Sequence, residues 1–311
     1  MASGDPADHV VWGRTTVDGR EAVYGTAGEG LAVLFLHGWA LDQRSYRRAL
    51  KRIVHLGCRV YAPALPGFGG TANLPESPSF DGYADWVAAF LDAVGVDEPA
   101  FVVGHSFGGG VGIKLAHDHP DRVRSLVLIN SVGGTTWSAA NLMPSGNPWL
   151  PWNWLAHRPD EVLPLRYLRR VVPIILEDAV PNVMRNPLWA FDVLNMLRQA
   201  DLLAELQELR RRELPVVVVW GDQDTVIPRA SFTALCAALG SEGQVVEGRH
   251  SWLLADPDAF GAILTNSIAV AQVARQLESE EAAEGKGDAG GGLARRIARH
   301  LPGGSREDPV A

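Results

Sequence analysis

The stretch Val102-Val103-Gly104-His105-Ser106-Phe107-Gly108-Gly109-Gly110 decides the fold of this chain. The apolar residues 100–103 predict a buried strand, and helix-compatible sequence follows over 110–117. A chain that turns sharply from strand to helix can expose one side chain at the apex, if the residues two positions away on either side are small. Ser106 has a glycine at both of those positions. The stretch therefore predicts a serine held out on a strand–turn–helix element, the geometry of a nucleophile elbow.

Buried-strand patterns alternate with helical patterns along most of the chain. Continuous apolar runs of strand length suit strands that are covered by helices on both faces, as in a parallel sheet. Strands are predicted over 31–36, 59–62, 100–103, 125–130, 216–220 and 244–247, and further helices over 42–56, 80–94, 232–239 and 256–278. Near the N-terminus, Asp18-Gly19 favours a tight hairpin between strands at 10–16 and 21–25. The alternation predicts the α/β class with an open, mostly parallel sheet flanked by helices.

The alternation stops between residues 133 and 212. This segment is rich in tryptophan, proline and asparagine, it has no buried-strand run, and its helical patterns cover 160–176 and 188–211. We therefore expect an α/β core over 9–132 and 213–278, with a helical cap inserted at 133–212.

The end of the chain, 279–311, has few large apolar residues, and this composition is typical of disorder. Within it, Leu293, Ile297 and Leu301 recur beside arginines. The spacing leaves open a small basic amphipathic helix that contacts a membrane or a partner.

The bulk composition argues against several classes of protein. The formal net charge of −8 is unlike that of a general nucleic-acid binder, which usually carries a basic surface. Residues 1–10 lack the basic and apolar regions of a signal peptide, and no run approaches the roughly 18 apolar residues of a membrane span. The distant cysteines Cys58 and Cys236 suit buried free thiols better than a disulfide. These features predict a cytoplasmic protein.

A serine hydroxyl needs a neighbouring base, and the base needs a group that orients it. In an open α/β sheet, loops that follow strands converge at one edge, so partners for Ser106 are sought there. Asp224 lies four residues after the strand predicted at 216–220, and His250 lies three residues after 244–247. The order Ser, Asp, His is typical of one type of catalytic triad.

Each partner has competitors. Asp222 also follows the 216–220 strand, but an aspartate at that place can simply cap the loop by accepting from backbone N–H groups. In some triads the acid follows the strand after the elbow helix, where this chain has Asn130, which is not a carboxylate. The competing histidines are His37 and His105, which lie in turns, and His117 and His119, which lie at the C-terminal end of the elbow helix. The last two have no apparent third metal ligand, so no metal is expected.

An oxyanion that forms during acyl transfer needs two backbone donors. The N–H of Phe107 is one candidate, because it follows the nucleophile at the start of a helix. The other should come from His37-Gly38-Trp39, after the strand at 31–36, and we assign it to the N–H of Trp39.

The chain resembles the α/β-hydrolase superfamily, in its subgroup of capped serine hydrolases and esterases. The matching motifs span about 21–275 and are His37-Gly38-Trp39, Leu65-Pro66-Gly67-Phe68-Gly69, Gly104-His105-Ser106-Phe107-Gly108-Gly109, Gly221-Asp222-Gln223-Asp224-Thr225-Val226-Ile227-Pro228 and Gly248-Arg249-His250. The resemblance implies Ser106 as nucleophile, Asp224 as acid, His250 as base and a helical cap over them. Two departures stand out. Ala64 replaces an aspartate that the family often has two residues before Pro66. The cap is unusually rich in tryptophan and proline, so the substrate does not carry over.

These features together predict a serine hydrolase that cleaves a carboxylic ester through an acyl-enzyme, without a cofactor. The apolar, aromatic cap favours a small-molecule or lipid-like ester with an apolar acyl or alcohol group. The alternatives with the same triad are a C–C bond hydrolase, a perhydrolase and an acyltransferase. A ligand-binding receptor with little turnover and a lipid-surface adaptor are alternatives of other classes. Dehalogenase and epoxide hydrolase relatives carry aspartate at the elbow, and Ser106 argues against both activities.

Overall fold

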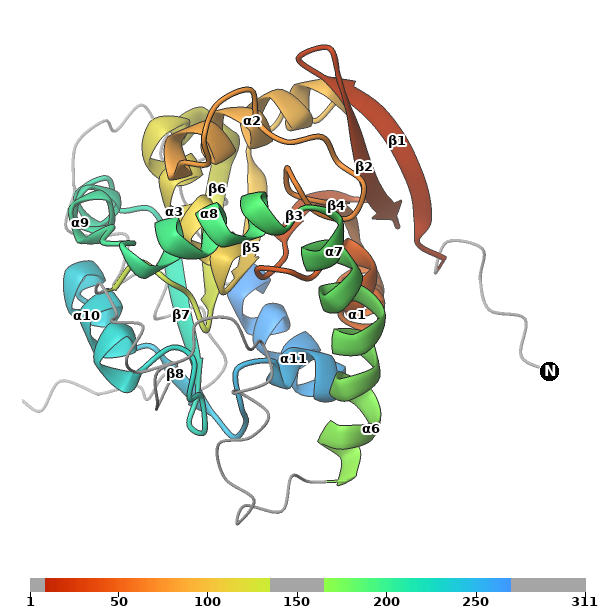
Figure 1. The fold of residues 1–311 in the computed structure, drawn as a ribbon. Helices are drawn as coiled ribbons and strands as arrows, with labels where there is room; N and C mark the ends of the chain where they lie inside the picture. The colour runs from red at the N-terminus through yellow and green to blue at the C-terminus, as the bar shows by residue number, and fades with distance from the viewer. Residues whose placement is uncertain (1–8, 135–164, 270–311) are drawn as a thin grey trace, which may run out of the picture. The chain divides into compact units, whose positions relative to one another are not determined.

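The computed structural model describes residues 9–134 and 165–269 (Figure 1). Most of the first half of the predicted cap, and the predicted tail at 279–311, lie outside these residues. Contacts divide the chain into two compact units, 1–261 and 262–311. The strands and the candidate site all belong to the first unit. In the second unit, the described residues 262–269 are helical.

An eight-stranded sheet organises the first unit, in the order β1-β2-β4-β3-β5-β6-β7-β8. Neighbouring strands are parallel from β4 to β8, whereas β1–β2 and β2–β4 are antiparallel. The α/β class and the mostly parallel sheet are therefore confirmed. The strands are β1 Val11–Val17, β2 Arg20–Ala27, β3 Leu31–Leu36, β4 Cys58–Pro63, β5 Ala100–His105, β6 Val123–Ile129, β7 Val216–Gly221 and β8 Gln244–Val246.

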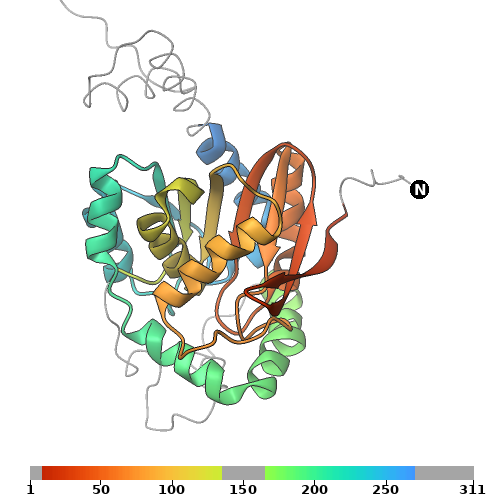
Figure 2. The ribbon, with the colours of Figure 1, turned by 90° about the horizontal axis from the view of Figure 1, so that it is seen from above.

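Helices cover both faces of this sheet. In the view from above, α2 and α3 lie on one side of the strands and α1 on the other (Figure 2). The labelled helices among the described residues of the first unit are α1 Arg47–His55, α2 Phe80–Ala93, α3 Phe107–Asp118, α6 Leu165–Ile174, α7 Val180–Arg185, α8 Pro187–Arg198, α9 Leu203–Arg211, α10 Arg229–Leu239 and α11 Trp252–Ala255, and a further helical segment begins at residue 257. Because both faces are covered, every residue of β5 is buried, as its continuous apolar run predicts.

The hairpin at the N-terminal edge forms at the predicted turn. Asp18 and Gly19 both have positive φ, 49° and 76°, as a two-residue turn of this kind requires. The second strand runs further than predicted, to Ala27, because Tyr24 to Ala27 pair with β4 on their other side. Both cysteines are free and buried, in agreement with the predicted thiols.

In two of the predicted helices, an aspartate side chain accepts from the backbone at a point where the structure departs from a regular α-helix. The helix expected over 188–211 is interrupted between α8 and α9, where the N–H of Leu202 donates to the carbonyl of Gly133. The Asp201 carboxylate accepts from the N–H of Leu203, so a side chain competes with helical hydrogen bonding at the break. The helix expected over 42–56 opens with a 3₁₀ turn, Gln43–Tyr46, which the Asp42 carboxylate caps.

Candidate active site

Ser106 occupies a strained turn between β5 and α3, with φ 54° and ψ −113°. A positive φ is costly for a residue with a side chain, and close packing around the turn holds it there. A Cβ on Gly104 would lie 2.4 Å from the carbonyl oxygen of Gly108, and one on Gly108 would lie 2.2 Å from that of Leu36. Neither position can hold a larger residue without moving backbone. The small residues that the sequence places around Ser106 thus have a direct steric cause.

The structure brings Ser106, His250 and Asp224 into one hydrogen-bonded line. The Nε2 atom of His250 lies 3.0 Å from the Ser106 hydroxyl, and its Nδ1 atom lies 2.9 Å from Oδ2 of Asp224. Because a carboxylate only accepts, Nδ1 carries the proton and Nε2 of the neutral ring is free to accept from the hydroxyl. The three residues come from the ends of β5, β7 and β8, which lie at the same edge of the parallel sheet.

Four donors surround the Asp224 carboxylate. Its Oδ1 accepts from the N–H groups of Val226 and Ile227, at 2.7 and 2.9 Å. Its Oδ2 accepts from His250 and from the side-chain amide of Asn130. Burial by itself raises the pKa of Asp224, but His250 and these hydrogen bonds outweigh burial and hold the pKa below its ordinary value. Asp224 therefore stays ionised although its side chain is buried.

Asn130, which the sequence did not assign to the site, is hydrogen-bonded to Asp224. Its backbone has a φ of 46°, a conformation that asparagine tolerates better than most residues. The indole N–H of Trp252 donates to its Oδ1 at 2.9 Å, which turns the amide N–H₂ toward Asp224. The one sequence signal was its place after the strand that follows the elbow helix.

Asp222, the competing carboxylate, has a different partner. Its Oδ1 accepts from the N–H of Gly248 at 2.9 Å and so braces the loop that carries His250. This contact is the loop-capping role that the sequence left open for Asp222.

The loop after β3 is fixed by His37. Its Nε2 accepts from the N–H of Leu65 at 2.8 Å, its Nδ1 donates to the Gly38 carbonyl at 2.9 Å, and its carbonyl accepts from the N–H of Gly108 at 3.1 Å. Burial lowers the pKa of His37 to about 4, so the ring is neutral near pH 7. In the described part of the chain, the backbone N–H groups of Trp39 and Phe107 have no acceptor.

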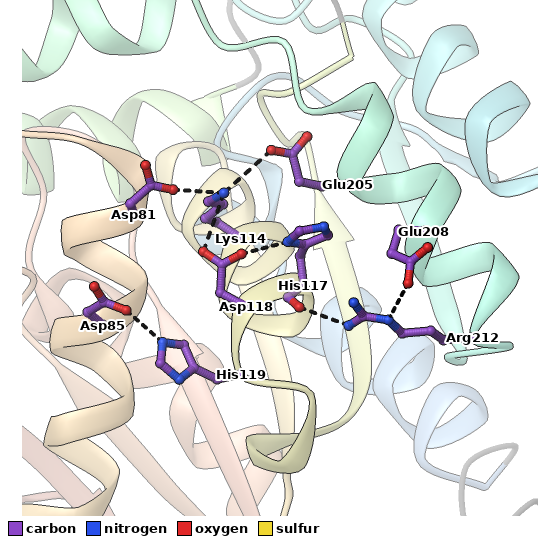
Figure 3. Close-up of polar contacts among 9 residues, drawn as sticks. All are labelled: Asp81, Asp85, Lys114, His117, Asp118, His119, Glu205, Glu208 and Arg212. Atoms are coloured by element: carbon purple, nitrogen blue, oxygen red, sulfur yellow. Dashed lines mark hydrogen bonds and ion pairs between the residues drawn. The ribbon is translucent and has the colours of Figure 1, made fainter.

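His117 and His119, two of the competing histidines, lie at the C-terminal end of α3 (Figure 3). His117 is within 2.6 Å of Asp118, and His119 is within 2.7 Å of Asp85 on α2. Lys114 contacts carboxylates of α2, α3 and α9 at the same end: Asp81, Asp118 and Glu205. Each histidine is thus paired with a different carboxylate. Among the described residues, no group of three or more ligating side chains is arranged to hold a metal ion.

Helices α7 and α8 are hydrogen-bonded to the loops that follow β3 and β4. The buried Asn182 accepts from the N–H of Gly69 at 3.2 Å and donates to the carbonyl of Ala40 at 3.0 Å. On α8, the Ala190 carbonyl accepts from the indole N–H of Trp39 at 3.0 Å. These contacts hold helices of the segment 133–212 against the loop that carries the Trp39 N–H.

The strand order and the serine on the turn after β5 define an α/β hydrolase. Residues 33–263 match the alpha/beta hydrolase family, and the chain belongs to that family. The family assignment agrees with the resemblance seen in the sequence.

Three known proteins illustrate the likeness. A dihydrolipoyllysine-residue acetyltransferase component of the acetoin cleaving system of Cupriavidus necator is 33% identical over 81% of this chain and 67% of its own length. A pimeloyl-[acyl-carrier protein] methyl ester esterase of Aromatoleum aromaticum is 31% identical over 67% of this chain and 85% of its own. The crystal structure of a membrane phospholipase A described as a bacterial virulence factor has a TM-score of 0.70 at 22% identity, covering 86% of this chain and 88% of that one, which shows the shared fold.

The family assignment establishes an enzyme of the α/β-hydrolase type that acts on a small molecule. In residues 9–134 and 165–269, no helix has the length and hydrophobicity that a membrane span requires.

Proposed function

We propose that the protein is a serine hydrolase that cleaves carboxylic esters with an apolar acyl or alcohol group. The observation that carries the proposal is the continuous line of hydrogen bonds from the Ser106 hydroxyl through His250 to Asp224. A serine polarised in this way is a nucleophile, and acyl transfer is the chemistry that such a line supports.

In the proposed reaction, His250 Nε2 takes the hydroxyl proton while Ser106 Oγ attacks the ester carbonyl carbon. The negative oxygen of the tetrahedral intermediate accepts from the N–H groups of Trp39 and Phe107, which lack an acceptor within the described chain. Collapse of the intermediate breaks the bond to the alcohol, which leaves with the proton from His250. Water then attacks the acyl-enzyme, His250 takes its proton, and the acid leaves Ser106.

We further propose that 133–212 is the cap that selects the substrate. In support, α7 and α8 contact the loop of Trp39 through Asn182 and Ala190. The described part of the segment also exposes large apolar side chains, Met184, Leu188 and Phe191. Such a surface suits an apolar substrate group.

Labelling with a fluorophosphonate probe tests the proposal, because this reagent reacts preferentially with an activated serine. Wild-type protein should label and should hydrolyse p-nitrophenyl esters, and Ser106→Ala should do neither. Turnover should be higher for medium-chain than for charged acyl groups. A wild-type protein that neither labels nor hydrolyses any ester of such a series would contradict the serine hydrolase.

Acyl transfer is the second candidate, since the relative from Cupriavidus necator is named an acetyltransferase component. The two activities share the acyl-enzyme and differ in what attacks it. In the presence of an added alcohol, a hydrolase releases mainly free acid. If most of the acyl group appears on the alcohol at low alcohol concentration, the transferase is the better description.

A further inference from the structure

A buried tyrosine–histidine pair joins the loop of the candidate oxyanion donor to the loop of the candidate base. Tyr46 belongs to the 3₁₀ turn before α1, and His105 directly precedes Ser106. Tyr46 is fully buried and His105 is 1% exposed. The proposed reaction uses neither side chain, yet His105 reaches the backbone of His250, and Tyr46 reaches that of Gly38, the residue before Trp39.

The pair forms a chain of three hydrogen bonds. The N–H of Gly38 donates to the Tyr46 hydroxyl at 3.0 Å, and the hydroxyl lies 2.7 Å from Nδ1 of His105. The other ring nitrogen of His105, Nε2, lies 2.9 Å from the carbonyl oxygen of His250.

The direction of each hydrogen bond follows from its ends. The His250 carbonyl can only accept, so Nε2 of His105 carries the ring proton. Nδ1 of the neutral ring must then accept, and the Tyr46 hydroxyl gives it its single hydrogen. The ring is neutral because burial, with His250 nearby, lowers the pKa of His105 to about 3. The hydroxyl lone pairs remain for the N–H of Gly38. The hydroxyl thus both donates and accepts, and each ring nitrogen of His105 has one partner.

The loop of the candidate oxyanion donor also packs closely against the pair. A Cβ on Gly38 would lie 2.9 Å from Nδ1 of His105 and 3.1 Å from the Tyr46 hydroxyl. Gly38, the residue before Trp39, is therefore in close contact with both side chains of the pair. On the other side, the His105 and His250 rings pack with their centroids 5.0 Å apart.

We propose that Tyr46 and His105 are positioning residues that set the distance between the Trp39 N–H and the His250 imidazole. This inference rests on the proposed serine hydrolase. The two groups act on opposite sides of the same carbonyl, on the oxygen and on the attacking hydroxyl, so their separation must match the transition state. Displacement of such a group by about 1 Å can lower the rate roughly 100-fold. The two rigid rings of the pair span this separation directly. Along the chain, by contrast, Trp39 and His250 are far apart, so the backbone between them does not fix the distance.

The experiment compares Tyr46→Phe with Tyr83→Phe, two fully buried tyrosines that each lose only a hydroxyl. The Tyr83 hydroxyl donates to the carbonyl of Pro66 at 2.9 Å and has no part in the pair. Both variants should lose similar thermal stability. With ester substrates, Tyr46→Phe should lower kcat about 10- to 100-fold with little change in KM, and should slow fluorophosphonate labelling by a similar factor. Tyr83→Phe should keep both rates within about threefold.

His105 provides a second pair of variants in case Tyr46→Phe does not fold. The amide of Gln at position 105 can still donate to the His250 carbonyl, whereas Leu of similar size cannot. His105→Gln should therefore retain most of the kcat that His105→Leu loses. A merely structural role would make kcat follow stability in all four variants, and that result would overturn the inference. Wild-type protein that fails to label would instead refute the serine hydrolase itself.

Discussion

At the scale of single residues, the partners of Asp224 distinguish it from Asp222 as the acid of the proposed triad. Asp224 faces four donors, among them His250, while Asp222 accepts from the N–H of Gly248. We expect Asp224→Asn to lower kcat roughly 10⁴-fold, because an amide there no longer selects the imidazole tautomer that leaves Nε2 free. Asp222→Asn keeps an oxygen for Gly248 and should cost less than about threefold. Steady-state kinetics on one ester distinguish the two, and equal losses would contradict the assignment.

The glycines beside Ser106 should tolerate no side chain. In Gly108→Ala, the new Cβ meets the Leu36 carbonyl oxygen at 2.2 Å, and backbone must shift to relieve the contact. We expect a loss of about 3 kcal/mol or more in the free energy of unfolding, measured with urea. In the control, Gly57→Ala, no atom lies within 4 Å of the new Cβ, and only the positive φ of 72° is unfavourable. That variant should lose about 1 kcal/mol. Similar losses for both would argue against close packing as the cause.

At the scale of elements, the Asn182 side chain joins α7 by hydrogen bonds to the loops that follow β3 and β4. Removal of its amide leaves the N–H of Gly69 and the carbonyl of Ala40 buried without their partner. Asn182→Ala should therefore cost about 1 to 3 kcal/mol, and it should raise KM more than it lowers kcat if the helix frames the substrate site. Asn195→Ala on α8 is a suitable control, because the Asn195 side chain is only partly buried and bonds to Arg198. Unchanged stability and KM in Asn182→Ala would contradict the anchor.

The sequence predicts some elements much better than others. Strands buried on both faces leave continuous apolar runs, so those of the central sheet were located to within a few residues. The break between α8 and α9 was missed, because it depends on a hydrogen bond from Leu202 to Gly133, about 70 residues away. The helical pattern of the sequence cannot indicate a contact between such distant residues.

In the candidate site, too, some residues could be predicted from the sequence and others could not. Ser106, Asp224 and His250 were found because each follows a predicted strand, and parallel strands bring such positions to one edge. Their chemical roles stay predictions. Tyr46 lies within the helix predicted over 42–56, and that pattern does not show that its hydroxyl meets His105, which is distant in the sequence. Asn130 was noted only as a residue that is not a carboxylate.

At the scale of the whole molecule, buried neutral histidines should make stability depend on pH. Burial lowers the pKa of His37 to about 4 and that of His105 to about 3, from 6.5 in the unfolded chain. Below pH 6.5 these two histidines bind protons in the unfolded state but not in the folded state. The free energy of unfolding therefore falls as the pH drops toward 4. Each histidine contributes a slope of about 1.4 kcal/mol per pH unit.

Urea unfolding of wild type and His37→Gln between pH 7 and 4 checks this effect. The variant should be less stable at pH 7, and its stability should fall less steeply with acid, by about one proton. Parallel curves for the two proteins would show that His37 does not contribute.

The crowded turn at Ser106 also limits how this enzyme can be changed. Its neighbours in space are backbone atoms of Gly108 and Leu36, which no substitution elsewhere can remove. A mutant library aimed at new substrates would therefore lose most of its folded members if it varied residues 104–109. Directed at the exposed Met184, Leu188 and Phe191, the same library would leave the residues of the proposed triad unchanged while it varies the surface of the proposed cap. The strained turn at Ser106 is thus a poor target for random mutagenesis, whereas the exposed residues of the proposed cap are a better one.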